Sequence, residues 1–424
     1  MDVKQTDKRG IFSWCMLAWA NSAFITVIAG FVFGPYFIHQ VAHDVIQGTV
    51  DWSWAIATVG IIVAFTAPLL GALVDQKRRR KPWLAVLTTI VVTCTALLYF
   101  TQPNAHWIAW GLTLFVFAGV AFELAQVIYN AMLYTLAPKD YIGRISGWGW
   151  SFIYFGGITC LSVALLLFIQ GHFFSTAHEN NIRLITLFSA LWVGFFSLPL
   201  FFFTKDLPER KITSIKALQR GFIALLINFR YLRHNKAVFF YLIANLIYTD
   251  GLNTLLAYSA IYASGTFHMQ IKEVIMLAIS VNLTAGLGAI IFAWVDDKIG
   301  SKFVICLSLI VLAATVIGML ITHSVIIFWV LALVGGIFLG PSQASSRSYM
   351  VRITPEHLAT QLFGFYALSG RVTAFIGPFL VGLLTKLYQS QRVGLFAPEL
   401  MLLLGLAFML FLPRHQKSPS QIQD

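Results

Sequence analysis

One carboxylate stands in the middle of a long apolar stretch. Asp250 lies thirteen residues from either end of the run 237–263, which at about 1.5 Å per helical residue places it near the centre of a hydrocarbon core about 30 Å thick. A lone carboxylate at that depth costs on the order of 3 kcal/mol, so it needs a partner or contact with water. The position favours a solute pathway. The alternative is a buried polar group that only holds helices together.

Polar residues surround Asp250 at helical spacing. Asn245, Thr249 and Asn253 form one line, and Asp250 and Thr254 form the line beside it. The pattern predicts a polar stripe at mid-membrane on a helix that is otherwise apolar.

Glu123 is a second embedded carboxylate. It shares a helix face with Gly119, Gln126 and Asn130. Two interpretations stay open, a proton or cation site that lines a cavity and a structural contact near the cytoplasmic end of the helix.

Other polar groups lie in the first and tenth apolar runs. Asn21 and Ser22 are near the middle of the first run, where hydrogen bonding to a solute competes with helix packing. Arg347 is near the inner end of the tenth run and is either a gate residue or a positive charge that only marks the cytoplasmic side.

Membrane-spanning helices must position these residues. The 424 residues are 58% hydrophobic and 11% charged, which leaves too little polar surface for a soluble globule. The first apolar run is long and follows a polar N-terminus, which indicates a retained helix and not a cleaved signal peptide. Twelve apolar runs are long enough to span: 12–38, 52–73, 83–101, 107–134, 145–169, 183–204, 237–263, 272–295, 303–322, 325–346, 361–386 and 394–412.

One long connection divides these runs six plus six. The sequence predicts an N-terminal half at 1–204, a cytoplasmic linker at 205–236 and a C-terminal half at 237–424. Within the linker, apolar residues recur at helical spacing between 215 and 232. This pattern predicts an amphipathic helix, which either lies on the inner leaflet or packs beneath the bundle.

The basic residues set the orientation. Of the 29 Lys and Arg residues, 24 fall in the N-terminus, the C-terminus and the even-numbered connections, four fall on the other side, and Arg371 lies inside a run. Both termini are therefore expected in the cytoplasm. The net charge of +12 is mainly a topology signal, and nucleic-acid binding has almost no support.

The sequence lacks the residues that several other activities would require. The four cysteines lie in apolar runs without a CxxC pair, so neither disulfides nor a metal site is expected. None of the ten histidines is deep in a run, which argues against a histidine proton relay or an embedded metal hydrolase. No Walker A sequence is present, so ATP does not drive this chain directly. No cofactor and no enzymatic activity are expected.

A motif follows the second apolar run. Residues 71–81 read Gly-Ala-Leu-Val-Asp-Gln-Lys-Arg-Arg-Arg-Lys, with a weaker copy at 293–302. The motif resembles the Gly-x-x-x-Asp-Arg-x-Gly-Arg-Arg/Lys signature of the major facilitator superfamily, although Gln76 and Arg78 replace the usual Arg and Gly.

Gly71 would let another helix approach closely, and Asp75 would lie against the partial positive charge of a helix N-terminus. The resemblance implies an all-α fold of twelve transmembrane helices in two six-helix halves, with this loop latching the halves in one access state. The residues assigned to that gate are Gly71, Asp75, Arg79, Arg80, Asp297 and Gly300.

The halves also resemble each other. Pro138 precedes Gly147 by nine residues, and Pro355 precedes Gly364 by nine. This repetition indicates an internal duplication, as in transporters built from parallel repeats.

Four segments carry a finer resemblance, to the vacuolar amino-acid effluxer family and its bacterial branch. They are Trp19-Ala-Asn21-Ser22-Ala-Phe24, Tyr129-Asn130-Ala131, Tyr248-Thr-Asp250-Gly251 and Gln343-Ala-Ser-Ser-Arg347-Ser. The likeness covers nearly the whole chain. It departs at Ala18, where the family usually has an Asp, so any role of that Asp must lie elsewhere in this chain. The resemblance implies efflux or exchange of amino acids or similar small solutes.

Arg371 is the expected counter-ion of Asp250. It lies ten residues into the eleventh run, roughly 15 Å deep, and the resemblance places the seventh and eleventh helices side by side. A purely structural ion pair is the alternative.

The sequence thus predicts a monomeric secondary transporter of small zwitterions in the bacterial inner membrane, with protons as the candidate coupling ion. A drug or metabolite exporter, a lipid flippase and a non-transporting sensor on the same fold are the alternatives. The candidate substrate and coupling residues are Asp250, Arg371, Glu123, Asn21, Ser22, Gln126, Asn130, Tyr248, Asn253, Gln343 and Arg347.

Overall fold

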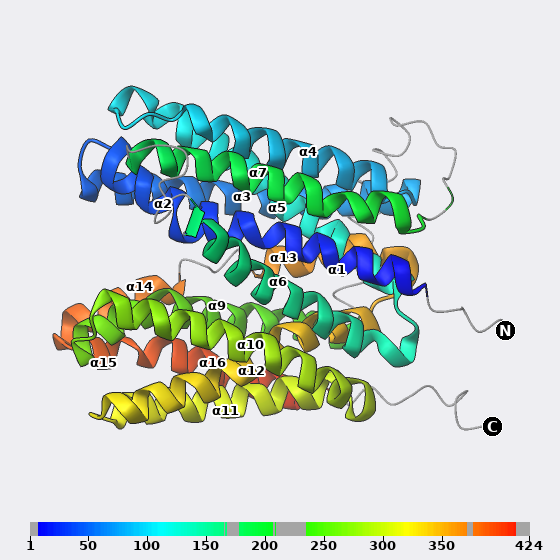
Figure 1. Cartoon of the computed structure of the whole chain (residues 1–424). Coiled ribbons are helices and arrows are strands. Elements are labelled where there is room, and N and C mark those ends of the chain that lie inside the picture. Colours follow the sequence, from blue (N-terminus) through cyan, green and yellow to red (C-terminus); the bar gives the residue numbers. More distant parts are fainter. Residues whose placement is uncertain are drawn as a thin grey trace.

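The computed structural model describes residues 7–164, 166–167, 178–206, 208, 235–370 and 376–412. Over these residues the chain forms long helices joined by short turns, with no strand (Figure 1). Each of the twelve predicted apolar runs coincides with helix where it is described. The predicted amphipathic helix at 215–232 lies outside the described residues, and the predicted linker boundaries stay a prediction.

The first run contains two π-helical stretches, in which the hydrogen-bonded turn is wider than in an α-helix. Its elements are α1 (Lys8–Ala23), η1 (Phe24–Phe31), α2 (Phe33–Tyr36) and η2 (Phe37–Val41). The rest of the N-terminal half consists of α3 (Val45–Lys77), α4 (Lys81–Leu97), η3 (Leu98–Phe100), η4 (Ala105–Trp107), α5 (Ile108–Leu136), η5 (Lys139–Tyr141), α6 (Ile142–Ala164) and α7 (His178–Phe203).

The C-terminal half repeats this pattern of long helices. Its elements are α9 (Lys236–Phe267), α10 (Ile271–Ile299), α11 (Ser301–Ile321), α12 (Val325–Ile353), η7 (Glu356–Leu358), α13 (Ala359–Ser369), α14 (Ile376–Tyr388), α15 (Gln391–Gly394) and α16 (Phe396–Phe411).

Polar side chains fix where several of these helices begin. Asp7, Asp44 and Asn235 accept hydrogen bonds from backbone N–H groups in the first turns of α1, α3 and α9. Because these N–H groups have no partner inside their own helix, each such cap stabilises the helix start by about 1 kcal/mol.

The helices have the length and surface of membrane spans. Nine of those in the described residues are long and apolar enough to cross a membrane, and the other three predicted runs coincide with α6, with α9, and with α13 and α14 together. Large side chains face outward, since Phe65, Leu191, Phe202 and Ile326 are 72–76% exposed. Exposed apolar surface on this scale indicates contact with lipid.

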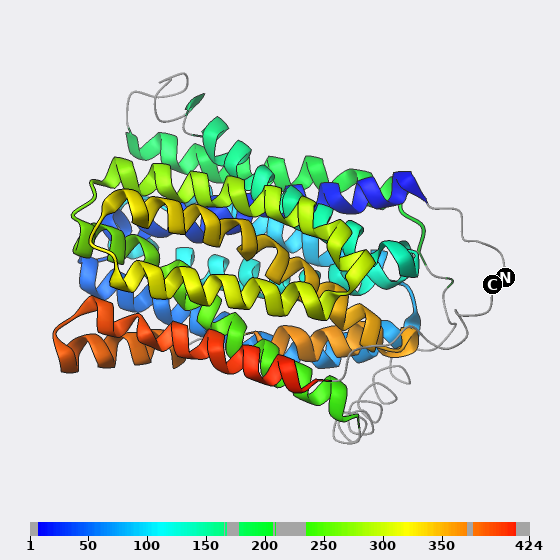
Figure 2. The same ribbon diagram turned by 90° about the horizontal axis from the view of Figure 1, so that it is seen from below.

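The two halves lie side by side with their helices along a common axis (Figures 1 and 2). At their contact the fifth helix of each half packs on the second helix of the other, α6 on α10 and α13 on α3. The end at which α1 begins and α16 ends also carries Arg80, Arg144 and Arg352, and is called the basic end below.

Equivalent turns join the second and third helices of each half. Arg78, between α3 and α4, has φ 65°, and Gly300, between α10 and α11, has φ 115°. Positive φ is easy for glycine but costs other residues about 1–2 kcal/mol. Arg78 thus occupies the position where the superfamily motif has glycine, and the turn keeps its left-handed backbone.

Replacing Arg78 with glycine should therefore stabilise the protein. We expect Arg78→Gly to raise the free energy of unfolding by about 1 kcal/mol, measured by thermal or denaturant unfolding of the purified chain in detergent. Arg79→Gly is the matched control, because Arg79 is also exposed but does not have positive φ. The same gain in both variants would contradict the explanation.

Candidate functional site

Two carboxylates join the halves at the basic end. Asp75, near the end of α3, accepts hydrogen bonds from the backbone N–H groups of Thr360 and Gln361, at 3.1 Å and 2.9 Å. These groups belong to the first turn of α13, where unpaired N–H groups and the helix dipole favour a negative charge. Asp75 thus lies where the sequence predicts it, against a helix N-terminus.

Asp297 makes the corresponding contact in the other direction. Its carboxylate accepts hydrogen bonds from the backbone of Gly143 at 2.7 Å and Arg144 at 3.0 Å, in the first turn of α6. Ion pairs reinforce it, with Arg144 Nε at 3.1 Å and Arg352 Nη2 at 3.1 Å. Asp296 is 3.0 Å from the same Arg352 nitrogen.

Glycines allow the helices to come this close. A Cβ atom on Gly71 would lie 2.6 Å from the carbonyl oxygen of Thr360, and one on Gly147 would lie 2.5 Å from that of Ala289. On Gly364 it would lie 2.8 Å from the carbonyl oxygen of Ala67. Any side chain at these positions would force the halves apart.

The basic run after Asp75 divides into exposed and buried residues. Arg78 and Arg79 are exposed, whereas Arg80 is buried, 3.9 Å from Asp75, and donates to the carbonyl oxygen of Ala131. Asp206 caps α4 by accepting from the backbone N–H groups of Arg80 and Lys81, both at 3.0 Å. The run therefore also holds the N-terminal half together.

Arg347 is a third link between the halves. The residue is 2% exposed, which excludes a surface charge that only marks topology. From α12 it donates to Ser146 Oγ on α6 at 2.9 Å, to the Ser146 carbonyl oxygen at 2.6 Å, and to Asn130 Oδ1 on α5 at 3.2 Å. Its guanidinium carbon lies 4.8 Å from the ring centre of Trp14.

Asp250 is buried at the middle of α9 and lies against the first described residues of α14. Its Oδ2 accepts a hydrogen bond from the backbone N–H of Gly377, in α14, at 3.3 Å. Its Oδ1 and the Thr254 hydroxyl have no hydrogen-bond partner in the described residues. The predicted partner Arg371 lies outside the described residues, so that ion pair stays a prediction.

A hydrogen-bonded network continues from α9 toward α12 and α13. The Tyr248 hydroxyl donates to Asn245 Oδ1 at 2.9 Å and lies 2.7 Å from Ser346 Oγ. Asn245 Nδ2 donates to Ser369 Oγ on α13 at 3.0 Å. Asn253 is exposed and does not join this network, so the predicted stripe is polar but not uniformly buried.

The remaining predicted residues differ in their burial and in how many hydrogen bonds they make. Ser22 donates to the Trp19 carbonyl oxygen at 2.6 Å and packs against Gly156, which is a structural contact between α1 and α6. Asn21 is buried and makes no side-chain hydrogen bond in the described residues. Gln126 and Glu123 are half-buried on α5.

Gln343 and Glu399 are two further polar residues in the helices, and Glu399 was not among the predicted site residues. Gln343 Oε1 accepts from the Tyr154 hydroxyl at 2.7 Å. Glu399, in the first turn of α16, is 3% exposed, and both its oxygens lack a partner in the described residues. The criterion that selected Asp250, a carboxylate inside an apolar run, would also have found Glu399. Tyr129 belongs to a segment that carries the family resemblance, whereas Trp14 and Trp150 had no sequence signal, since tryptophan is common in membrane helices.

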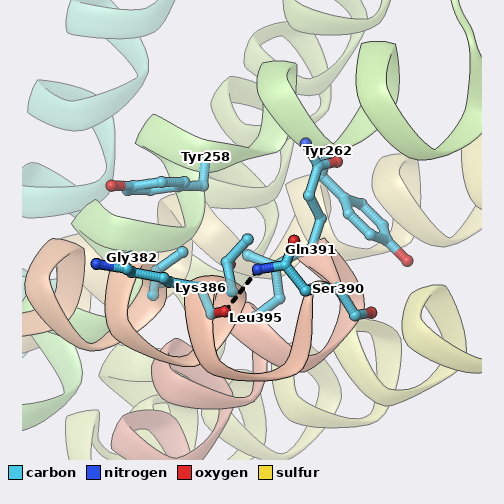
Figure 3. Close-up of a pocket in the computed structure, with 10 residues that line it drawn as sticks. Tyr258, Tyr262, Gly382, Lys386, Ser390, Gln391 and Leu395 are labelled. Carbon is cyan, nitrogen blue, oxygen red and sulfur yellow. Dashed lines mark hydrogen bonds between the residues drawn. The ribbon is translucent and has the colours of Figure 1, made fainter.

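A cavity of about 400 Å³ opens at the end opposite the basic end. Residues of α9, α14 and α15 line it, among them Tyr258, Tyr262, Lys386 and Gln391 (Figure 3). None of the residues that the sequence predicted for the site lines this cavity. The predicted residues that the structure describes therefore lie outside this opening.

Comparison with known proteins identifies the family. The family model described as vacuole effluxer Atg22 like matches residues 52–421. The chain belongs to this family. An uncharacterized MFS-type transporter of Bacillus subtilis, YxiO, is 25% identical over 412 residues, which cover 95% of this chain and 94% of that protein. Autophagy-related protein 22 of Saccharomyces cerevisiae is 25% identical over 297 residues, 62% of this chain and 55% of that protein.

Solved structures agree on the fold. The proton:xylose symporter XylE superposes with a TM-score of 0.77 at 13% identity, over 96% of both chains. The Escherichia coli fucose:proton symporter FucP gives 0.77 at 12% identity, over 97% of this chain and 100% of that chain. The Atg22-like chain is thus an integral, multi-pass transporter of the major facilitator superfamily, as the sequence predicts, and not an enzyme.

The contacts of Asp75 predict how the basic end opens. Asp75→Asn removes the charge that caps α13, which should weaken the closed state by about 1 kcal/mol, or roughly five-fold. Cys15, which is 2% exposed on α1 beside Trp14, reports opening. In a variant that keeps only this cysteine, Asp75→Asn should speed its reaction with a maleimide about five-fold.

Asp206→Asn is the matched control for this experiment. It removes a carboxylate cap of the same kind. This cap joins the end of α7 to the start of α4, and both helices belong to the N-terminal half. It should lower thermal stability without exposing Cys15. Equal acceleration by Asp206→Asn, or none by Asp75→Asn, would show that the cap of α13 does not hold the halves closed.

Proposed function

We propose that this chain exports amino acids or similar small zwitterions by alternating access, with protons moving in the opposite direction. It works as a monomer in a bacterial cytoplasmic membrane, with the basic end and both termini in the cytoplasm. The orientation is supported by the asymmetry of Lys and Arg, because positively charged connections stay on the cytoplasmic side. Export is supported by the description of the family as vacuole effluxers.

The half-satisfied carboxylate of Asp250 carries the proposal. One oxygen accepts from Gly377, and the other lies beside the Thr254 hydroxyl and is buried without a hydrogen bond in the part of the chain that the structure describes. An ionised carboxylate at mid-membrane is costly, and either a proton or an ammonium group relieves that cost. Because both need the same oxygen, each displaces the other, and this competition exchanges solute for proton.

The network beside Asp250 supplies further polar contacts. Asn245 and Tyr248 are buried but hydrogen-bonded to neighbouring side chains. Asn21 is buried and makes no side-chain hydrogen bond to another described residue. In the proposal it offers a donor and an acceptor from the N-terminal half. A solute with opposite charges and few polar atoms fits this balance better than a large apolar cargo.

The closed basic end determines which step of the cycle this state represents. In the proposal, Asp75, Asp297 and Arg347 bar the cytoplasmic exit, so the pathway is occluded or open to the outside. All three bond from one half to the other. Rocking the halves about their contact breaks these bonds together and opens the pathway to the cytoplasm.

Asp250→Asn should abolish solute movement that a pH gradient drives, because asparagine neither takes up a proton nor attracts an ammonium group. Asn253→Ala is the control on the same helix, since Asn253 is exposed, and it should transport at the wild-type rate. The measurement is flux of each of the twenty radiolabelled amino acids through the purified chain in liposomes, with and without a pH gradient.

The outcomes separate the parts of the proposal. Gradient-driven flux at the wild-type rate in Asp250→Asn would move coupling to another residue. Wild-type flux that ignores the gradient would leave a uniporter. Binding of an amino acid without flux would favour the sensor interpretation, and no response to any amino acid would reject the substrate class.

A further inference from the structure

Arg347 uses only part of its hydrogen-bonding capacity. A guanidinium has five N–H donors, and three of them are bonded to Ser146 and Asn130. The residue is 2% exposed, and no described carboxylate lies within 4.0 Å of it. Among the described residues this buried charge has only uncharged partners, and it lacks the anion that usually accompanies it.

Two further groups that can donate a hydrogen bond lie around Arg347. The guanidinium carbon lies 5.6 Å from the ring centre of Tyr129 and 5.9 Å from that of Trp150. The Tyr129 hydroxyl and Trp150 Nε1 are buried and have no hydrogen-bond partner in the described residues. One place thus gathers a guanidinium, a phenol hydroxyl and an indole N–H, with no carboxylate among the described residues within 4.0 Å of the guanidinium.

A glycine keeps this place open. A Cβ atom on Gly149 would lie 2.8 Å from Arg347 Nη2 and 2.7 Å from the Trp14 ring. Any larger residue there would push the guanidinium away from the rings. Because the rings contribute roughly 0.5–2 kcal/mol each through cation–π contact, they hold the charge in position without neutralising it.

We propose that Arg347, Tyr129 and Trp150 form an anion subsite that takes the carboxylate of the transported solute. This inference rests on the proposed function for the identity of the solute, but not for the existence of the subsite. Arginine presents two parallel N–H groups that match a carboxylate. The spare donors of Tyr129 and Trp150 would complete its hydrogen bonds.

The subsite lies on a path from Asp250 toward the basic end. Arg347 is six residues from the end of α12, about 9 Å from the basic end, whereas Asp250 is fourteen residues into α9, about 21 Å from it. Gln343 and Tyr154 lie one helical turn farther from the basic end than Arg347 and Trp150, and they are bonded to each other. They form the layer between the two charges.

This separation assigns the two charges to different steps. The amine and carboxylate of an α-amino acid are only about 3 Å apart, so one molecule does not bridge levels that differ by about 12 Å. The solute therefore meets Asp250 and Arg347 in succession. When the basic end opens, Arg347 loses Ser146 and Asn130, and the carboxylate of the solute replaces them as its partner.

The test uses acetate and acetamide, which differ in charge but hardly in size. Thermal unfolding of the purified full chain should shift to higher temperature with millimolar acetate and not with acetamide. Arg347→Gln should weaken the apparent acetate affinity at least ten-fold, and Arg347→Lys less. Arg392→Gln is the matched control, because Arg392 also donates to backbone carbonyl oxygens but lies near the opposite end. It should bind acetate as the wild type does.

Two further variants keep the proposal falsifiable if Arg347→Gln does not fold. Tyr129→Phe and Trp150→Phe each remove one spare donor and should each weaken acetate binding several-fold. An equal effect of acetate and acetamide, or full acetate binding by Arg347→Gln or by both of these variants, would overturn the subsite. Acetate binding without amino-acid flux would instead reject the proposed substrate and keep the subsite.

Discussion

Helix N-termini held by carboxylates from the opposite half are the constraint on which this structure depends. Asp75 caps α13 and Asp297 caps α6, each with two backbone hydrogen bonds. Each bond is worth about 1–2 kcal/mol, since an ionised acceptor meets N–H groups that lack another partner. An interaction of that size holds two large bodies together and still lets thermal motion or a ligand part them.

The charges in the pathway depend on that closure. Arg347 is hydrogen-bonded to Ser146 and Asn130 only while the halves meet, and Asp250 lies against α14 within the C-terminal half. Opening the basic end therefore strips partners from Arg347 and leaves those of Asp250 in place. In the proposed cycle, a solute that carries both signs of charge compensates the two residues at different steps, and its passage is thereby linked to the movement of the halves.

Much of this arrangement could be predicted from the sequence, because it repeats local rules. The twelve apolar runs predicted the membrane-spanning helices, and the resemblance of residues 71–81 to the superfamily motif implied the major facilitator fold. The same motif led us to expect Asp75 at a helix N-terminus. The duplication predicted from Pro138 and Pro355 recurs in three dimensions, where each proline precedes the helix that a carboxylate caps.

The rest depended on contacts between distant segments. No spacing rule indicates that Trp14, Tyr129 and Trp150 surround Arg347, because they come from three helices and are ordinary membrane residues. The hydrogen bond from the Gly377 N–H to Asp250 was equally hidden, since it requires α14 to lie beside the middle of α9. Helical spacing grouped Asn253 with Asn245, yet Asn253 is exposed. Spacing predicts which residues share a helix face, but not how deeply each of them is buried.

The two interhalf caps should decide which end of the protein is open. Two pairs of spin labels report this directly. One pair, at Asp140 and Lys298, spans the halves at the basic end, and the other, at Gln102 and Gln389, spans them at the opposite end. All four positions are exposed. Double electron–electron resonance should show that Asp75→Asn combined with Asp297→Asn lengthens the first distance and shortens the second. Unchanged distances, or two distances that lengthen together, would contradict the claim.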